Sequence, residues 1–121
     1  MKRMLFIGLA AAIATAMPAR ADDIQKLAAQ VSEFDFGLPA DLARYSNMVS
    51  TSEFCGWTNI NFGPKLEARM AKLKDDAQRA KAKSLYEAIL KADKAALKPG
   101  DKASICTDAN KADIAELYKE W

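Results

Sequence analysis

The chain has 121 residues, of which 50% are hydrophobic and 28% charged, and its 18 basic and 16 acidic side chains give a net charge of +2. It contains no histidine, which excludes Ser-His-Asp and Cys-His nucleophile systems and removes the commonest metal ligand. Its five glycines form neither a G-x-x-x-x-G-K-[ST] nor a G-x-G-x-x-G nucleotide-binding pattern. We therefore predict a protein that is not an enzyme and that uses no metal and no cofactor.

Residues 1–21 have the three parts of a secretory signal peptide. The basic residues Lys2 and Arg3 precede an apolar run over residues 4–17, and an A-x-A pattern ends at Ala21. The apolar run is shorter than the roughly 20 residues of a membrane-spanning helix. We predict cleavage after Ala21, export to the periplasm or the medium, and no stable membrane insertion once the signal is removed.

Residues 22–121 are then expected to form a single α-helical domain, and cleavage changes its charge. The segment retains 15 basic and 16 acidic side chains, a net charge of −1. This balance does not favour general attraction to a polyanion. We predict no binding to nucleic acid.

The first two predicted helices cover residues 22–34 and about 39–55. Gly37 suits the end of the first helix and Pro39 the first turn of the second. Apolar residues recur in each helix at steps of three or four residues. These positions are Ile24, Leu27, Val31 and Phe34 in the first helix, and Leu38, Leu42, Tyr45, Val49 and Cys55 at or near the second.

The next predicted helical region starts near Pro64, and its apolar stripe changes phase after Lys83. Such a change indicates either one long bent helix or two helices joined between residues 75 and 81. A turn is predicted over residues 97–104 from its proline and glycine. A last helix is predicted over residues 104–119, and its inward positions would be Ile105, Cys106, Ala109, Ile114 and Leu117.

Cys55 and Cys106 are the only cysteines, and an even number in an exported chain indicates a disulfide. Nothing resembles a redox C-x-x-C motif, so we predict a structural crosslink between two helix ends. The predicted fold class is all-α, a small bundle of four to five helices stapled by one disulfide.

Three aromatic residues lie close to Cys55 in the sequence: Phe54, Trp57 and Phe62. Beside a disulfide, such residues often pack around the crosslink, and this is the interpretation that we favour. The alternative is an exposed aromatic patch that binds a partner.

Charge is segregated along the chain. Residues 64–98 contain ten basic and five acidic side chains, whereas residues 22–63 and 99–121 are net negative. We favour internal charge complementarity with local helix pairs such as Asp75 with Arg79. The alternative is a partner-binding basic face, which would consist of Lys65, Arg69, Lys72, Arg79 and Lys83.

The small, exported, all-helical plan with two distant cysteines is similar in architecture to the acid-stress periplasmic chaperones of the HdeA type. That resemblance implies a stress chaperone that loosens when acid protonates its carboxylates. The other hypothesis, which we favour, is a non-catalytic protein-interaction or accessory module with an unknown protein partner. A homodimer also stays open, because five apolar residues suit either a monomer core or a dimer interface: Met70, Leu73, Leu85, Ile89 and Leu90.

Overall fold

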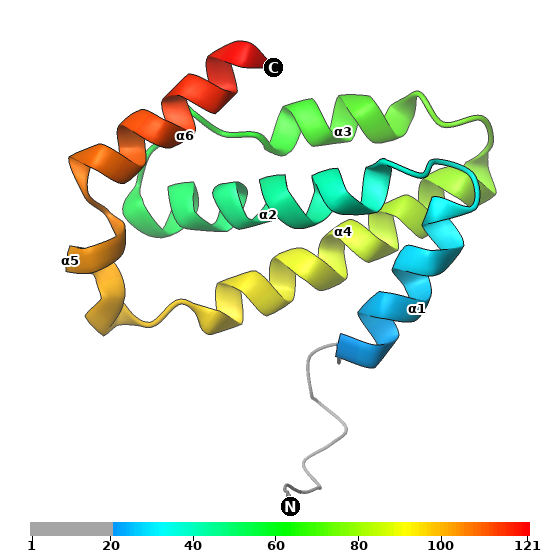
Figure 1. The fold of residues 1–121 in the computed structure, drawn as a ribbon, viewed down its shortest axis with the longest axis horizontal. Helices are drawn as coiled ribbons and strands as arrows, with labels where there is room; N and C mark the ends of the chain where they lie inside the picture. Colours follow the sequence, from blue (N-terminus) through cyan, green and yellow to red (C-terminus); the bar gives the residue numbers. More distant parts are fainter. Residues whose placement is uncertain (1–20) are drawn as a thin grey trace, which may run out of the picture.

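The computed structural model describes residues 21–121, and these residues form an all-α bundle without β-strands (Figure 1). The predicted fold class is therefore confirmed, whereas the predicted signal peptide lies almost entirely outside the described residues. No helix in this part of the chain combines the length and apolar character needed to cross a bilayer. The elements are α1 (Ala21–Ser32), α2 (Leu38–Cys55), α3 (Gly63–Ala71), α4 (Asp76–Ala96), the 3₁₀ helix η2 (Pro99–Asp101), α5 (Lys102–Ile105) and α6 (Asp108–Glu120).

The first two helices follow the predicted ranges to within two residues. Asp22 and Asp23 lie in the first turn of α1, where acidic side chains interact favourably with the helix dipole. Helix α2 has Pro39 in its first turn and ends at Gly56, which has a left-handed φ of 74°. Glycine adopts this conformation without steric cost, so the helix stops directly after Cys55.

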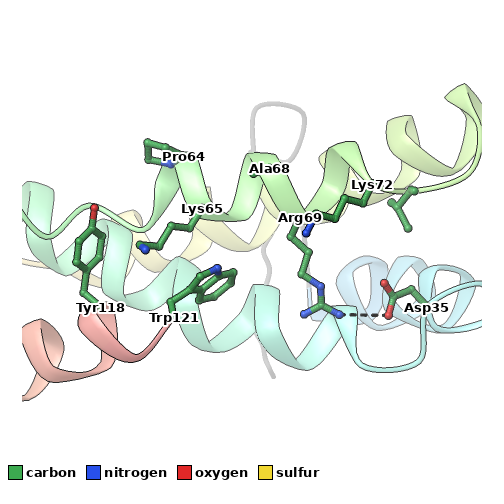
Figure 2. A pocket seen from close by; sticks show the side chains of 9 residues that line it. Asp35, Pro64, Lys65, Ala68, Arg69, Lys72, Tyr118 and Trp121 are labelled. Atoms are coloured by element: carbon green, nitrogen blue, oxygen red, sulfur yellow. Dashed lines mark hydrogen bonds and ion pairs between the residues drawn. The ribbon is translucent and has the colours of Figure 1, made fainter.

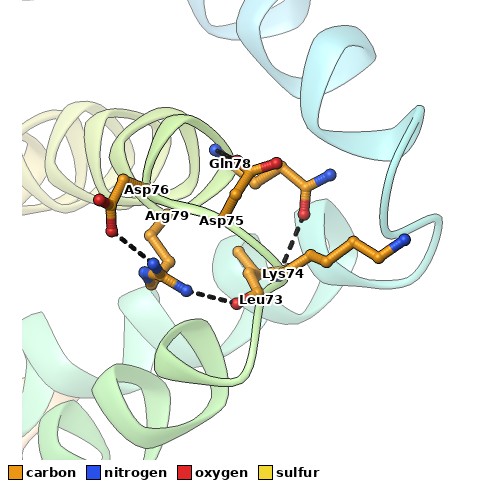
Figure 3. A network of polar contacts seen from close by, with 6 residues as sticks. All are labelled: Leu73, Lys74, Asp75, Asp76, Gln78 and Arg79. Carbon is orange, nitrogen blue, oxygen red and sulfur yellow. Dashed lines mark hydrogen bonds and ion pairs between the residues drawn. The ribbon is translucent and has the colours of Figure 1, made fainter.

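Of the two alternatives for the region that starts near Pro64, two helices is correct, because α3 and α4 are separate (Figure 3). The break precedes α4, whereas the predicted phase change follows Lys83, which lies within α4. Asp75 caps α4 by accepting a hydrogen bond from the backbone N–H of Gln78 at 2.8 Å. The Gln78 side chain accepts from the backbone N–H of Lys74 at 3.2 Å, and Arg79 donates to the carbonyl of Leu73 at 2.6 Å. These bonds satisfy backbone groups at the break, which lies at the N-terminal edge of the predicted joint.

The prediction of one last helix over residues 104–119 is wrong. Cys106 leaves helical geometry with φ −89° and ψ 49°, and Thr107 starts α6 by accepting a hydrogen bond from the Asn110 N–H at 3.1 Å. An N-cap threonine satisfies a backbone donor that a continuous helix would have bonded differently. Ala109, predicted to point inward, is exposed. Part of the predicted turn before this region is also helical, as η2 and α5.

Helix α2 is the central element, and α4 packs along it while α1, α3 and α5 contact it at other positions (Figure 1). Met70, Leu85 and Ile89 are buried in the monomer core, and Leu73 and Leu90 are partly buried against it. These five side chains are therefore occupied within one chain. The buried core consists of Val31, Leu38, Leu42, Val49, Phe62, Leu66, Met70, Ala82, Leu85, Tyr86 and Ile89.

The predicted disulfide is present and joins the C-terminal end of α2 to the residue after α5. Cys55 and Cys106 have their Cα atoms 5.5 Å apart, although 51 positions separate them in the chain. The bond thus fixes the start of α6 beside the end of the central helix. It is also of the kind found mainly in proteins of oxidising compartments, which is compatible with export.

We predict that the double substitution Cys55→Ser/Cys106→Ser lowers the free energy of unfolding by about 2–4 kcal/mol. Crosslinking a loop of this length restricts the unfolded chain by about 4 kcal/mol in the chain-entropy model, and native strain reduces that figure. Urea unfolding of the oxidised protein and the variant measures the difference. Equal midpoints and equal slopes would show that the crosslink does not stabilise the fold.

Candidate functional site

Four aromatic rings from three parts of the chain meet around Phe62, which is 0% exposed. Its ring centroid lies 4.8 Å from that of Tyr45 and 5.3 Å from that of Tyr118. Trp121 closes the group, at 4.6 Å from Tyr45 and 5.9 Å from Phe62. Aromatic pairs at these separations contribute beyond their buried area. These contacts hold the end of α6 against α2 and the start of α3.

An open cleft of about 530 Å³ lies beside this aromatic group. Figure 2 shows Tyr118 at one end and Asp35 at the other, with Trp121 and Arg69 between them. Helix α3 runs along the cleft and lines it with one face. Residues at steps of three and four positions share that face. The α3 face contributes Lys65, Ala68, Arg69 and the following residue Lys72.

Arg69, predicted as part of a basic face, is neutralised within the fold. Its guanidinium donates to Asp35 at 3.3 Å and also forms an ion pair with Asp41. Asp35 lies in the turn before α2 and Asp41 in the first turn of α2. Arg69 therefore ties α3 to the start of α2 and offers little net charge to a ligand.

Lys65 and Lys72 are different, because neither forms an ion pair with any group in residues 21–121. Lys65 places its Nζ atom 4.4 Å from the centroid of the Tyr118 ring, a favourable cation–π distance. Lys72 is exposed just after α3. The cleft thus has two cations without carboxylate partners, and one of them is positioned by an aromatic ring.

The other two residues of the predicted basic face do not line this cleft. Arg79 forms an ion pair with Asp76 and bonds the Leu73 carbonyl, so it serves the start of α4 (Figure 3). Lys83 is exposed on α4. The predicted pair of Asp75 with Arg79 is wrong, because the Asp75 side chain caps the helix instead. Internal complementarity accounts for Arg69 and Arg79. Of the three lysines of the predicted face, Lys65 and Lys72 line the cleft and Lys83 does not.

The three aromatic residues near Cys55 do not form one exposed patch. Phe62 is fully buried among other aromatic rings. Phe54 and Trp57 are half-buried and line two different pockets. Phe54 lies beside Lys102, whose Nζ atom is 5.4 Å from the ring centroid. The alternative of an exposed aromatic patch is therefore wrong for Phe62. Phe54 and Trp57 do not form a single surface either, because they line different pockets.

Sequence reasoning missed Tyr118 and Trp121, which both line the cleft. Their three-residue spacing is that of neighbours on one helix face, and that spacing was the available signal. It does not say which distant residues the two rings meet. The sequence therefore indicated an aromatic face on the last helix but not a binding site.

Two ionisable groups have shifted pKa values, the buried Tyr86 and the partly buried Asp93. Burial raises the pKa of Tyr86, and the nearby carboxylates Glu67 and Glu53 raise it further. Burial also raises the pKa of Asp93 on α4. One carboxyl oxygen of Asp93 is buried without a hydrogen-bond partner among the described residues, and burial without such a partner disfavours the charged form.

Within residues 21–121, no three His, Cys, Asp or Glu side chains are grouped as a metal site would need. Comparison of the chain with family models, with curated proteins and with solved structures finds no match. The functional argument therefore depends on the cleft and its chemistry.

We predict that Asp93→Asn raises the free energy of unfolding at pH 7. The folded-state pKa of Asp93 lies above its unfolded value, so the folded state binds the extra proton and stability falls as pH rises through that pKa. Asparagine removes the cost of the buried charge at neutral pH. Urea unfolding at a series of pH values should show the advantage of the variant shrinking as pH falls and the carboxyl protonates in both states. An advantage that is absent at pH 7, or that grows on acidification, contradicts this assignment.

Proposed function

We propose that this protein is an exported, non-catalytic protein-interaction module that binds a partner protein in the cleft beside α3. The observation that carries the proposal is the pair of lysines, Lys65 and Lys72, which face an open cleft beside Trp121 without carboxylate partners. Exposed aromatic residues such as Trp121 are enriched at sites that recognise proteins, and lysines without internal partners attract acidic groups of a partner.

Two features support export as the setting of this function. Structural disulfides such as Cys55–Cys106 persist mainly in oxidising compartments, and residues 1–21 have the pattern of a signal peptide. In such a compartment a crosslinked bundle offers a cleft with fixed walls. A preformed site loses less conformational entropy on binding than a flexible one.

A stress chaperone is the second candidate, and the packing of α6 favours it. Helix α6 has no fully buried side chain, yet its aromatic residues cover Phe62 and Tyr45. Displacement of α6 would expose aromatic surface to an unfolded client. A chaperone of this kind suppresses aggregation of unrelated proteins after acidification, whereas an interaction module captures one partner while folded.

We predict that Ala68→Met removes partner capture while leaving the fold intact. Ala68 is exposed and lines the cleft, so the larger side chain fills the site, and methionine is a good helix former. Affinity capture from a periplasmic extract, followed by mass spectrometry, compares wild type with this variant. Enrichment of any specific partner should be at least tenfold lower with the variant than with wild type.

The matched control is Ala80→Met, which places the same side chain at an exposed position of α4 outside the cleft. It should capture the same partner as wild type. Undiminished capture by Ala68→Met, or no specific capture by wild type, rejects the proposed function. Aggregation suppression at low pH that is equal in all three proteins would favour the chaperone instead.

A further inference from the structure

We infer that the cleft recognises an extended acidic segment of the partner protein, in which carboxylates bind Lys65 and Lys72 and flanking apolar side chains contact exposed aromatic rings. This inference rests on the proposed function and adds the chemistry of the ligand. It depends on the placement of the two lysines, on the residues that lie between them on α3, and on the aromatic residues that line the cleft.

Lys65 and Lys72 are seven positions apart, which corresponds to nearly two full turns of helix. Both side chains therefore project from the same face, with their Cα atoms separated by about 10 Å along the axis. An extended peptide covers that distance in about three residues. Acidic residues two to four positions apart match this spacing, because lysine side chains are long and flexible.

Ala68 and Arg69 lie between the lysines and explain why the cleft is open there. Ala68 has a small side chain and is exposed, so it leaves the space between the two lysines unfilled. Arg69 turns toward Asp35 and Asp41 and is held by both. A bound segment therefore meets the two lysine ammonium groups while the arginine stays engaged with the fold.

One of the two exposed large hydrophobic residues of the described chain, Trp121, lines this cleft and is 41% exposed. The other, Phe36, is 89% exposed and directly follows Asp35, which lines the end of the cleft away from Tyr118 (Figure 2). An exposed aromatic ring beside charged groups suits a segment with apolar residues next to its acidic residues.

Charge elsewhere favours a short acidic peptide over a polyanion or a membrane. Residues 22–63 and 99–121 are net negative, and residues 22–121 together carry a net charge of −1. Nucleic acids and anionic membranes are bound by extended basic surfaces. Two lysines in a cleft of about 530 Å³ match a small ligand or a short chain segment in size.

The test uses fluorescence of Trp121 in a Trp57→Phe background, where it is the only tryptophan. The probe is the synthetic peptide acetyl-Ala-Leu-Glu-Ala-Glu-Glu-Leu-Ala-amide, and the matched probe replaces each glutamate with glutamine. We expect saturable binding of the acidic peptide and at least tenfold weaker binding of the glutamine peptide. Binding of the acidic peptide should also weaken as salt increases, because the carboxylates interact with exposed cations.

Lys72→Glu should weaken binding of the acidic peptide about tenfold, since it replaces an attraction with a repulsion at an exposed position. Lys83→Glu makes the same charge change on α4 outside the cleft and should leave binding unchanged. Thermal unfolding of each variant verifies that the fold is retained. Equal loss in both variants would show a general charge effect and would overturn the inference.

Equal binding of the two peptides, or no binding of either, also overturns the acidic-segment inference. Cleft-dependent partner capture in the Ala68→Met experiment would then leave the proposed function standing with a ligand of different chemistry. Tighter binding to heparin, or to vesicles of phosphatidylglycerol and phosphatidylcholine, than to the acidic peptide would assign the lysines to a polyanion or a membrane surface instead.

Discussion

The disulfide between Cys55 and Cys106 is the constraint on which the cleft depends. Helix α6 buries none of its side chains fully, so apolar packing alone gives it a weak attachment. The crosslink fixes the start of α6 beside the end of α2, and this raises the effective concentration of its aromatic residues near Phe62. Tyr118 and Trp121 then pack on Phe62 and form one wall of the cleft. A covalent bond at one end of α6 thus positions the aromatic wall of the cleft at its other end.

The local electrostatics of the cleft depend on which cations the fold uses for itself. Half-exposed ion pairs such as those of Arg69 contribute little to stability on their own, but they neutralise the guanidinium that lines the cleft. Arg79 is likewise engaged by Asp76 and a backbone carbonyl. Once these pairs are made, the unpaired cations that line the cleft are two lysines, Lys65 and Lys72, beside an aromatic wall. The excess of positive charge in residues 64–98 therefore overstates the charge that a partner would meet.

Helical periodicity predicted the all-α class, the first two helices and most of the core, because each of these depends on residues within a few positions of one another. The errors arose where a single polar side chain decides a boundary. Thr107 begins a new helix by accepting a hydrogen bond, and Asp75 accepts one from the Gln78 N–H in place of the predicted ion pair with Arg79. Phe62 was assigned to the disulfide region from its closeness to Cys55 in the chain, whereas its ring contacts Tyr45 from α2 and Tyr118 and Trp121 from the C-terminal end.

Local sequence was enough to establish the helical character of the chain, the pairing of its only two cysteines and the charge excess around α3. These properties follow from composition and short-range spacing, and packing does not change them. The cleft was decided by tertiary structure alone, because Lys65 and Tyr118 are far apart in the chain, yet the Lys65 Nζ atom lies 4.4 Å from the centroid of the Tyr118 ring. Side chains from distant segments meet only when the core has packed, so their meeting leaves no periodic pattern in the sequence.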